Sequence, residues 1–274
     1  MTRGAAEILL SRHEHVPPRA VAASAVLRLV DDPDSSAQAL ARAIGADPGF
    51  AARVLRIANS TYYGLSGRVS TLPLAVSVIG FQAIRGLAVA AAAGLDDPDG
   101  APEGFWRAAA LAATGTELVA ARIGADPGDA FCVGLLHTIG AALLHQHRPG
   151  IALCLPEPLD VGQLLDDERE EYGITHDELG ARVLAGWNFP EHLCSLIGRH
   201  HEVVLPDATP LERSLRTSRV LADLLLTDAT PTAAQQAHLV WLTEGRLGEA
   251  DLPGVLEHLA EQSAGLLAGL LRGS

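Results

Sequence analysis

The sequence predicts an all-α fold, a multi-helical bundle, and three observations lead to it. Ala, Leu and Val must fill the core, because 48% of the 274 residues are hydrophobic but only 4% are aromatic. Small, unbranched apolar side chains favour closely packed helices. Asp-Pro pairs, which suit the first turn of a helix, recur along the chain. The sustained alternation of apolar and polar residues that is typical of strands does not occur.

Each helix is expected between residues that start or stop helices. Gly-Ala-Asp-Pro-Gly occurs at residues 45–49 and 124–128, where Asp can cap the free N–H groups and Pro fits the first turn. Thr175 and Glu178 form a capping-box pattern that predicts a helix start at His176. With apolar periodicity, these signals predict helices over 18–30, 35–44, 48–59, 72–79, 81–94, 103–123, 127–146, 160–172, 176–187, 190–201, 210–226, 232–245 and 252–271.

Turn-forming residues divide the chain into three expected parts. Residues 1–95 form an N-terminal helical half, 104–205 a second half that carries most of the histidines, and 206–274 a C-terminal helical extension. Residues 95–104, rich in Asp, Pro and Gly, are the expected hinge, and residues 149–158 an expected surface loop.

Charge excludes two classes of partner. The net charge is −13, with a pI near 5.2, which opposes non-specific binding to nucleic acid and to an anionic membrane face. The apolar stretch 74–95 is interrupted by Gln82 and Arg85, so we expect core helices and no membrane span. The N-terminus does not resemble a signal peptide, and the three cysteines form no Cys-x-x-Cys pair. These features favour a cytoplasmic protein.

Histidines near helix ends form the candidate metal site. Imidazole and carboxylate groups from separate helices could converge on an ion inside a bundle. The alternative is that they are hydrogen-bonded core residues, which the lack of a short ligand spacing such as His-Glu-x-x-His favours. Adjacent residues on a helix point about 100° apart, so the His200-His201 pair is not expected to share one ion easily. The candidate ligands are His137, His176, His200, His201 and Asp223.

Two other stretches carry polar residues. The acidic run 166–171 is interpreted as the solvent-exposed face of a helix. Residues 52–64 end a helix in a polar turn that holds two of the three tyrosines. Tyrosine packing would explain this turn, and the alternative is a recognition surface; Asn59 and Tyr63 are therefore the candidate partner-binding residues.

The order of these motifs resembles the HDOD domain, an output domain of bacterial signalling proteins that is related to the HD phosphohydrolases. The similarity covers about residues 15–205 and extends to Asp223. It rests on many spaced motifs in the same order, at residues 27–34, 46–48, 53–64, 75–81, 105–107, 134–140, 172–176, 180–181, 187–190 and 200–201.

This resemblance implies a regulatory, all-α, cytoplasmic bacterial protein in a family generally regarded as non-catalytic, with residues 104–205 as its HD-like half. Related HD phosphodiesterases bind metal through a first histidine after a Trp, a His-Asp pair, later histidines and a final Asp. Ala108 stands where that first histidine is expected, and Thr138 replaces the Asp of the pair. Threonine is a poor ligand for a hard divalent cation. The remaining ligands are then a vestigial set.

We therefore expect a non-catalytic signalling protein that binds a regulatory protein partner, with no catalytic residue and no cofactor, although the histidines could retain a divalent metal such as Zn²⁺. The alternatives are a metal-dependent phosphohydrolase or cyclic-dinucleotide phosphodiesterase, and a nucleotide-binding sensor without turnover. The combination of Ala108 and Thr138 separates the first interpretation from the second.

Overall fold

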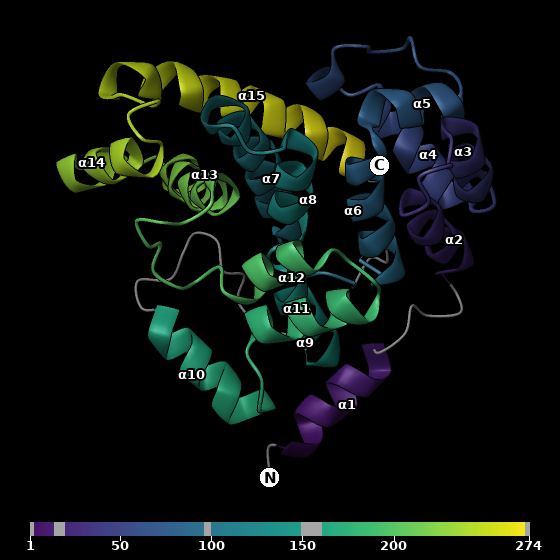
Figure 1. Ribbon diagram of the computed structural model, residues 1–274, viewed down its shortest axis with the longest axis horizontal. Helices are drawn as coiled ribbons and strands as arrows, with labels where there is room; N and C mark the ends of the chain where they lie inside the picture. Colours follow the sequence, from purple (N-terminus) through teal and green to yellow (C-terminus); the bar gives the residue numbers. More distant parts are fainter. Residues whose placement is uncertain (1–2, 14–19, 96–99, 149–160, 272–274) are drawn as a thin grey trace.

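All regular elements of the described chain are helical, as the sequence predicts. The computed structural model describes residues 3–13, 20–95, 100–148 and 161–271, and no strand occurs within these ranges. Figure 1 shows a central group of helices, with the helices of residues 21–79 on one side and those of residues 210–242 on the other. The expected loop 149–158 and residues 96–99 of the expected hinge lie outside the described residues, and the three-part division of the chain stays a prediction.

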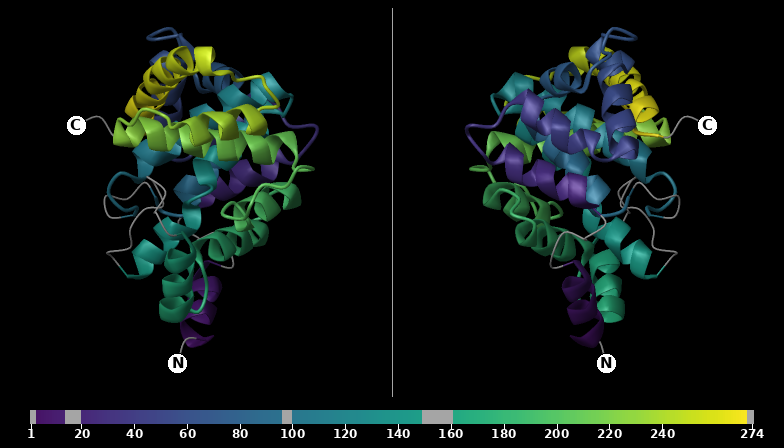
Figure 2. Two further views of the ribbon diagram at one scale, coloured as in Figure 1. Left: turned by 90° about the vertical axis from the view of Figure 1, so that its left-hand side faces the viewer. Right: turned by 90° about the vertical axis from the view of Figure 1, so that its right-hand side faces the viewer.

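The N-terminal helices begin and end close to the expected positions. Asp47 caps its helix by accepting hydrogen bonds from the N–H groups of Gly49 (2.9 Å) and Phe50 (3.1 Å). Helix α1 was not expected, and it lies at the opposite end of the molecule from the C-terminal helix (Figure 2). These elements are α1 (Arg3–His13), α2 (Val21–Val30), α3 (Ala37–Gly45), α4 (Pro48–Ala58), η2 (Thr61–Tyr63), α5 (Leu72–Ile79) and α6 (Phe81–Ala92).

The helix expected over 127–146 is interrupted at His137 and Thr138, which divide it into two helices. In a continuous helix the Gly134 carbonyl would accept the N–H of Thr138. The Nδ1 atom of His137 lies 2.8 Å from that carbonyl and competes for it. The central helices are α7 (Phe105–Ile123), α8 (Pro127–Leu136), α9 (Ile139–His147), α10 (Val161–Tyr172), α11 (His176–Gly186) and α12 (Glu191–Gly198).

Two of the C-terminal helices pack on α7, and the helix between them packs on the first of the two. Thr209 and Glu212 form a capping box that begins α13 (Pro210–Thr227), and Thr232 and Gln235 form another that begins α14 (Ala233–Leu242). After η3 (Glu249–Asp251), α15 (Leu252–Leu270) crosses α7 and reaches α4 (Figure 1). Gly269 permits this contact, since a Cβ there would lie 2.9 Å from the Cα of Ile57.

Two apolar clusters form the core. The larger cluster includes residues from α1 to α12 together with Leu215 of α13 and Leu266 and Leu270 of α15. The smaller cluster joins α7 to α13, α14 and α15. Within the described chain, residues 127–147 are long and apolar enough to cross a membrane, but 83% of their apolar window is buried by the rest of the fold. The apolar pair α5 and α6 is bent by 106°. These stretches are packed as core helices.

Candidate functional site

Two histidines at the ends of helices are held by the same kind of hydrogen bond to the backbone. His137 follows α8, and its Nδ1 lies 2.8 Å from the carbonyl oxygen three residues earlier, on Gly134. His200 follows α12, and its Nδ1 lies 2.7 Å from the carbonyl of Ile197. A carbonyl only accepts, so each Nδ1 carries the hydrogen and each Nε2 keeps a lone pair. The two ring centroids are 5.3 Å apart.

His176 enters the site because two helices approach closely without side chains between them. A Cβ on Gly140 of α9 would lie 1.8 Å from the His176 carbonyl and 2.8 Å from the N atom of Gly180 of α11. Only glycine fits at position 140, and its absence of a side chain brings the start of α11 against α9. The first residue of α11 is His176, which is fully buried.

Glu168 of α10 holds His176 in place. Its carboxylate accepts the backbone N–H of His176 (2.8 Å) and lies 2.8 and 3.0 Å from Nδ1 of the same residue. The capping box expected from Thr175 is wrong, because the Thr175 hydroxyl makes no cap and has no hydrogen-bond partner. The exposed face expected for residues 166–171 is wrong at Glu168, which is 4% exposed.

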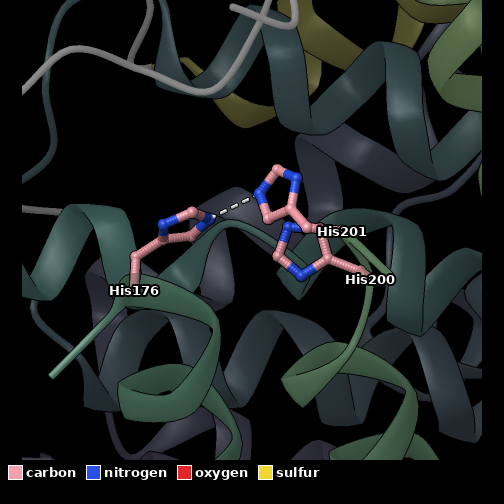
Figure 3. Close-up of side chains that lie close together, drawn as sticks. All are labelled: His176, His200 and His201. Carbon is pink, nitrogen blue, oxygen red and sulfur yellow. Dashed lines mark hydrogen bonds between the residues drawn. The ribbon is translucent and has the colours of Figure 1, made fainter. Parts of the chain in front are cut away.

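His201 completes the cluster. Its Nε2 lies 3.0 Å from Nε2 of His176, and Figure 3 shows this contact beside the His200 ring. The centroids of His200 and His201 are only 4.2 Å apart. The expectation that these neighbours diverge fails because α12 ends at Gly198, so neither residue has a helical position. Potential ligand atoms of His176, His200 and His201 lie within 4.8 Å of one another.

Burial keeps the two innermost imidazoles neutral. Desolvation, followed by the positive charge of Arg219, lowers the pKa of His137 to about 3. The same two causes, in the same order, hold the pKa of His200 well below its ordinary value. The Nε2 atoms of both residues are buried without a hydrogen-bond partner. Both rings therefore present lone pairs inside the fold at neutral pH.

Arg219 of α13 is fully buried beside these rings. Its Nη1 donates to the backbone carbonyl of His200 (2.9 Å), and its Nη2 lies 3.3 Å from Nδ1 of His201. Sequence reasoning missed both Arg219 and Glu168. The usable signal for Arg219 was the recurrence of arginine every three residues at 213, 216 and 219 on one helix. Glu168 carried no such signal among its acidic neighbours.

The other positions of the predicted ligand set add nothing to the converging nitrogens. Ala108 of α7 is buried, and its methyl group binds no metal. The hydroxyl of Thr138 is buried without a partner and offers no negative charge. Asp223 is half-buried on α13, one turn beyond Arg219, and is not among the residues whose ligand atoms meet.

The donor set does not fit a two-metal hydrolytic centre. Three converging imidazole nitrogens are ligands of the kind that a single borderline cation such as Zn²⁺ prefers. A pair of divalent ions that activates water needs carboxylate ligands and charge neutralisation. Within the described chain, no carboxylate joins the nitrogens that meet, and Glu168 binds His176 on its Nδ1 side.

The predicted partner-binding residues both have contacts inside the fold. The side-chain amide of Asn59 donates to the carbonyls of Leu55 (2.9 Å) and Val69 (2.7 Å), and its oxygen accepts the N–H of Val69 (3.0 Å). Tyr63 packs edge-on against Tyr62 with ring centroids 4.7 Å apart, and burial raises the pKa of its phenol. Their role toward a partner stays a prediction.

An exposed apolar loop follows the histidine pair. Val203 is 82% exposed and Leu205 60% exposed. The loop lines a cavity of about 290 Å³ whose wall includes His200. Arg213 of α13 ties this region to the end of α14, since it donates to the carbonyls of Pro206 (2.6 Å) and Trp241 (3.2 Å).

Comparison with known proteins gives a consistent family and fold. The HDOD domain family matches residues 16–203. An uncharacterised protein of Treponema pallidum (strain Nichols) is 24% identical over 220 residues, which are 73% of this chain. The chain spans only 40% of the length of that relative.

Two solved structures illustrate the similarity in fold and sequence. A protein of Shewanella amazonensis SB2B, described provisionally as a phosphohydrolase, is 28% identical with a TM-score of 0.68, and the match covers 96% of this chain and 98% of that one. The MmoQ response regulator of Methylococcus capsulatus str. Bath is 27% identical with a TM-score of 0.52, over 86% of this chain and 96% of the other.

Proposed function

This chain belongs to the HDOD family, and we propose that it is a non-catalytic signalling protein that acts by binding a partner protein. The response regulator among its structural neighbours supports a signalling role. The single observation that carries the non-catalytic assignment is the lack of any carboxylate, in the described residues, at the place where the histidine nitrogens converge.

The competing function is metal-dependent phosphate-ester hydrolysis. The description of the 28%-identical Shewanella protein and the three converging imidazoles favour it. Hydrolysis would require a metal-bound hydroxide held in a fixed geometry. Because Ala108 and Thr138 withhold two ligands, including one charge, the scaffold keeps histidines in place without the groups that activate water.

The partner surface that we propose is the apolar loop formed by Val203, Val204 and Leu205. Large apolar side chains with this exposure are common at protein interfaces. Exposed Glu202 and Asp207 border the same cavity, as do Arg216 and Arg199, which pairs with Glu212 at 2.9 Å. The whole chain carries a net charge of −13. A second copy of this acidic chain would be repelled, so the complementary occupant is a basic, amphipathic segment of another protein.

A cross-linking and binding experiment tests this assignment. A photoreactive residue at position 203 is used in the native cell to find the partner, whose affinity for the purified chain is then measured at low and high salt. The double variant Val203→Ser/Leu205→Ser should bind at least about 10-fold more weakly, because it loses two buried apolar side chains. Leu74→Ser, another exposed apolar residue (45%), should bind normally. Equal binding by the double variant would remove this surface from the proposal.

A further inference from the structure

The histidine cluster ends in opposite charges at two distant elements of the fold. Arg219 of α13 approaches Nδ1 of His201 at 3.3 Å, His201 approaches His176 at 3.0 Å between their Nε2 atoms, and Nδ1 of His176 lies 2.8 Å from the Glu168 carboxylate. Each of these contacts is within hydrogen-bond distance. The four side chains therefore form a continuous hydrogen-bonded chain from a cation to an anion.

The charged residues at the two ends, Arg219 and Glu168, determine which atom donates in each hydrogen bond of this network. Arg219 can only donate, so Nδ1 of His201 accepts and its Nε2 carries the hydrogen. That hydrogen is donated to Nε2 of His176, whose Nδ1 then carries the hydrogen that the Glu168 carboxylate accepts. The nitrogens of His176 and His201 that face each other are engaged with each other.

Backbone packing fixes the position of Arg219. The preceding residue, Ser218, donates its hydroxyl to the carbonyl of Ala112 on α7 at 3.1 Å. Gly115 of α7 permits this approach, since a Cβ there would lie 2.4 Å from the Ser218 hydroxyl. The guanidinium is also held by the His200 carbonyl at 2.9 Å. Arg219 is therefore an integral, buried part of the cluster.

We infer that Arg219 supplies, from within the chain, the positive charge that a divalent metal would bring to these histidines, and so closes the site to metal. A permanent cation that contacts one candidate ligand and the backbone of a second repels an added divalent ion, most strongly in a buried site. It also occupies a lone pair of His201. The inference concerns the charge inside the site and stands apart from the partner-binding role proposed above.

Cobalt binding by the untagged full chain tests this inference, because Co²⁺ held by histidines absorbs visible light and needs no enzymatic assay. Four proteins are compared: the wild type, Arg219→Met, Arg219→Lys, and Arg213→Met as a control that removes another buried arginine of the same helix. We expect Arg219→Met to bind one Co²⁺ about 10–100-fold more tightly than the other three, the range over which groups contacting metal-bound histidines alter affinity. Zn²⁺ should raise the Tm of Arg219→Met and leave the Tm of the wild type unchanged.

Three results would contradict the inference. Wild-type protein that binds Co²⁺ as tightly as Arg219→Met would overturn the inference. So would an Arg219→Met protein that gains no metal affinity, or one that stays unfolded with Zn²⁺ present while Arg219→Lys folds. If Arg219→Met folds only with Zn²⁺, as followed by circular dichroism, the inference is supported. None of these results depends on finding a partner.

Discussion

Glu168 accepts two hydrogen bonds from His176, one from the backbone N–H and one from the ring Nδ1. The carboxylate thus replaces the helix cap that Thr175 does not provide and fixes the orientation of the imidazole. The pair links α10 to the first turn of α11, and through His201 to Arg219. Glu168, although it belongs to the acidic run 166–171, is therefore part of the candidate site.

Replacing Glu168 with Gln should destabilise the fold. The variant loses the charge of a buried acceptor that takes two hydrogen bonds, and such bonds contribute about 1.5–3 kcal/mol each. We expect a loss of about 2 kcal/mol in the free energy of unfolding, measured by urea denaturation. Glu170→Gln, two residues away and exposed, is the control and should change stability by less than about 0.5 kcal/mol. Equal effects in the two variants would contradict the role of Glu168.

Gly140→Ala should be poorly tolerated, because the added Cβ would lie 1.8 Å from the His176 carbonyl. Helix α9 and helix α11 must then separate, at a cost of about 1–3 kcal/mol or more. Thermal unfolding measures the effect. The control is Gly254→Ala in α15, where a Cβ meets nothing within 4 Å and the greater helix propensity of Ala should stabilise slightly. A Gly140→Ala protein as stable as wild type would show that the two helices separate without cost.

The two innermost histidines should make the protein less stable in mild acid. The pKa of His137 falls from 6.5 to about 3 on folding, so between these values the unfolded chain binds one more proton. Stability is therefore full above pH 6.5 and falls as the pH is lowered, by about 1.4 kcal/mol per pH unit for this group. His200 contributes in the same direction.

Glu117 opposes this loss and provides a test of it. Burial raises the pKa of Glu117 from 4.5 to about 7, so its contribution to stability is present below pH 4.5 and is lost as the pH rises through about 7. The Glu117→Gln variant lacks this opposing contribution to the pH dependence of stability. Urea unfolding at pH 7 and pH 5 should show a steeper loss of stability in the variant than in wild type. A stability that does not change between these pH values in either protein would contradict the buried, neutral state of the histidines.

Asn59 should act first as a structural residue. Asn59→Asp replaces the amide that donates to the Leu55 and Val69 carbonyls with an acceptor, so two carbonyls face a carboxylate. We expect a loss of about 1–3 kcal/mol in stability. Tyr63→Phe keeps the packing against Tyr62 and should leave stability within about 1 kcal/mol. If both variants fold normally yet lose the partner, the recognition surface predicted from the sequence holds.

The sequence predicted the helices better than the site. Asp47 and Asp126 cap their helices as expected, because an N-cap is a local interaction. The break at His137 was missed, since a side-chain bond to Gly134 leaves no trace in apolar periodicity. Convergence of the histidines was one of two interpretations that the sequence left open, and the structure brings His176, His200 and His201 together. The role of Arg219 was not predicted, because it depends on a contact with His201, which lies in a loop eighteen residues earlier in the chain.

The central claim, a histidine site without hydrolytic activity, is tested most directly by a turnover assay. The purified untagged protein is incubated in turn with an excess of Mn²⁺, Fe²⁺ or Zn²⁺, together with cyclic dinucleotides and with a generic phosphodiester. We predict no hydrolysis above the buffer rate with any of the metals. Metal-dependent turnover that disappears in His137→Ala, in a variant shown by circular dichroism to be folded, would contradict the claim and establish a phosphohydrolase.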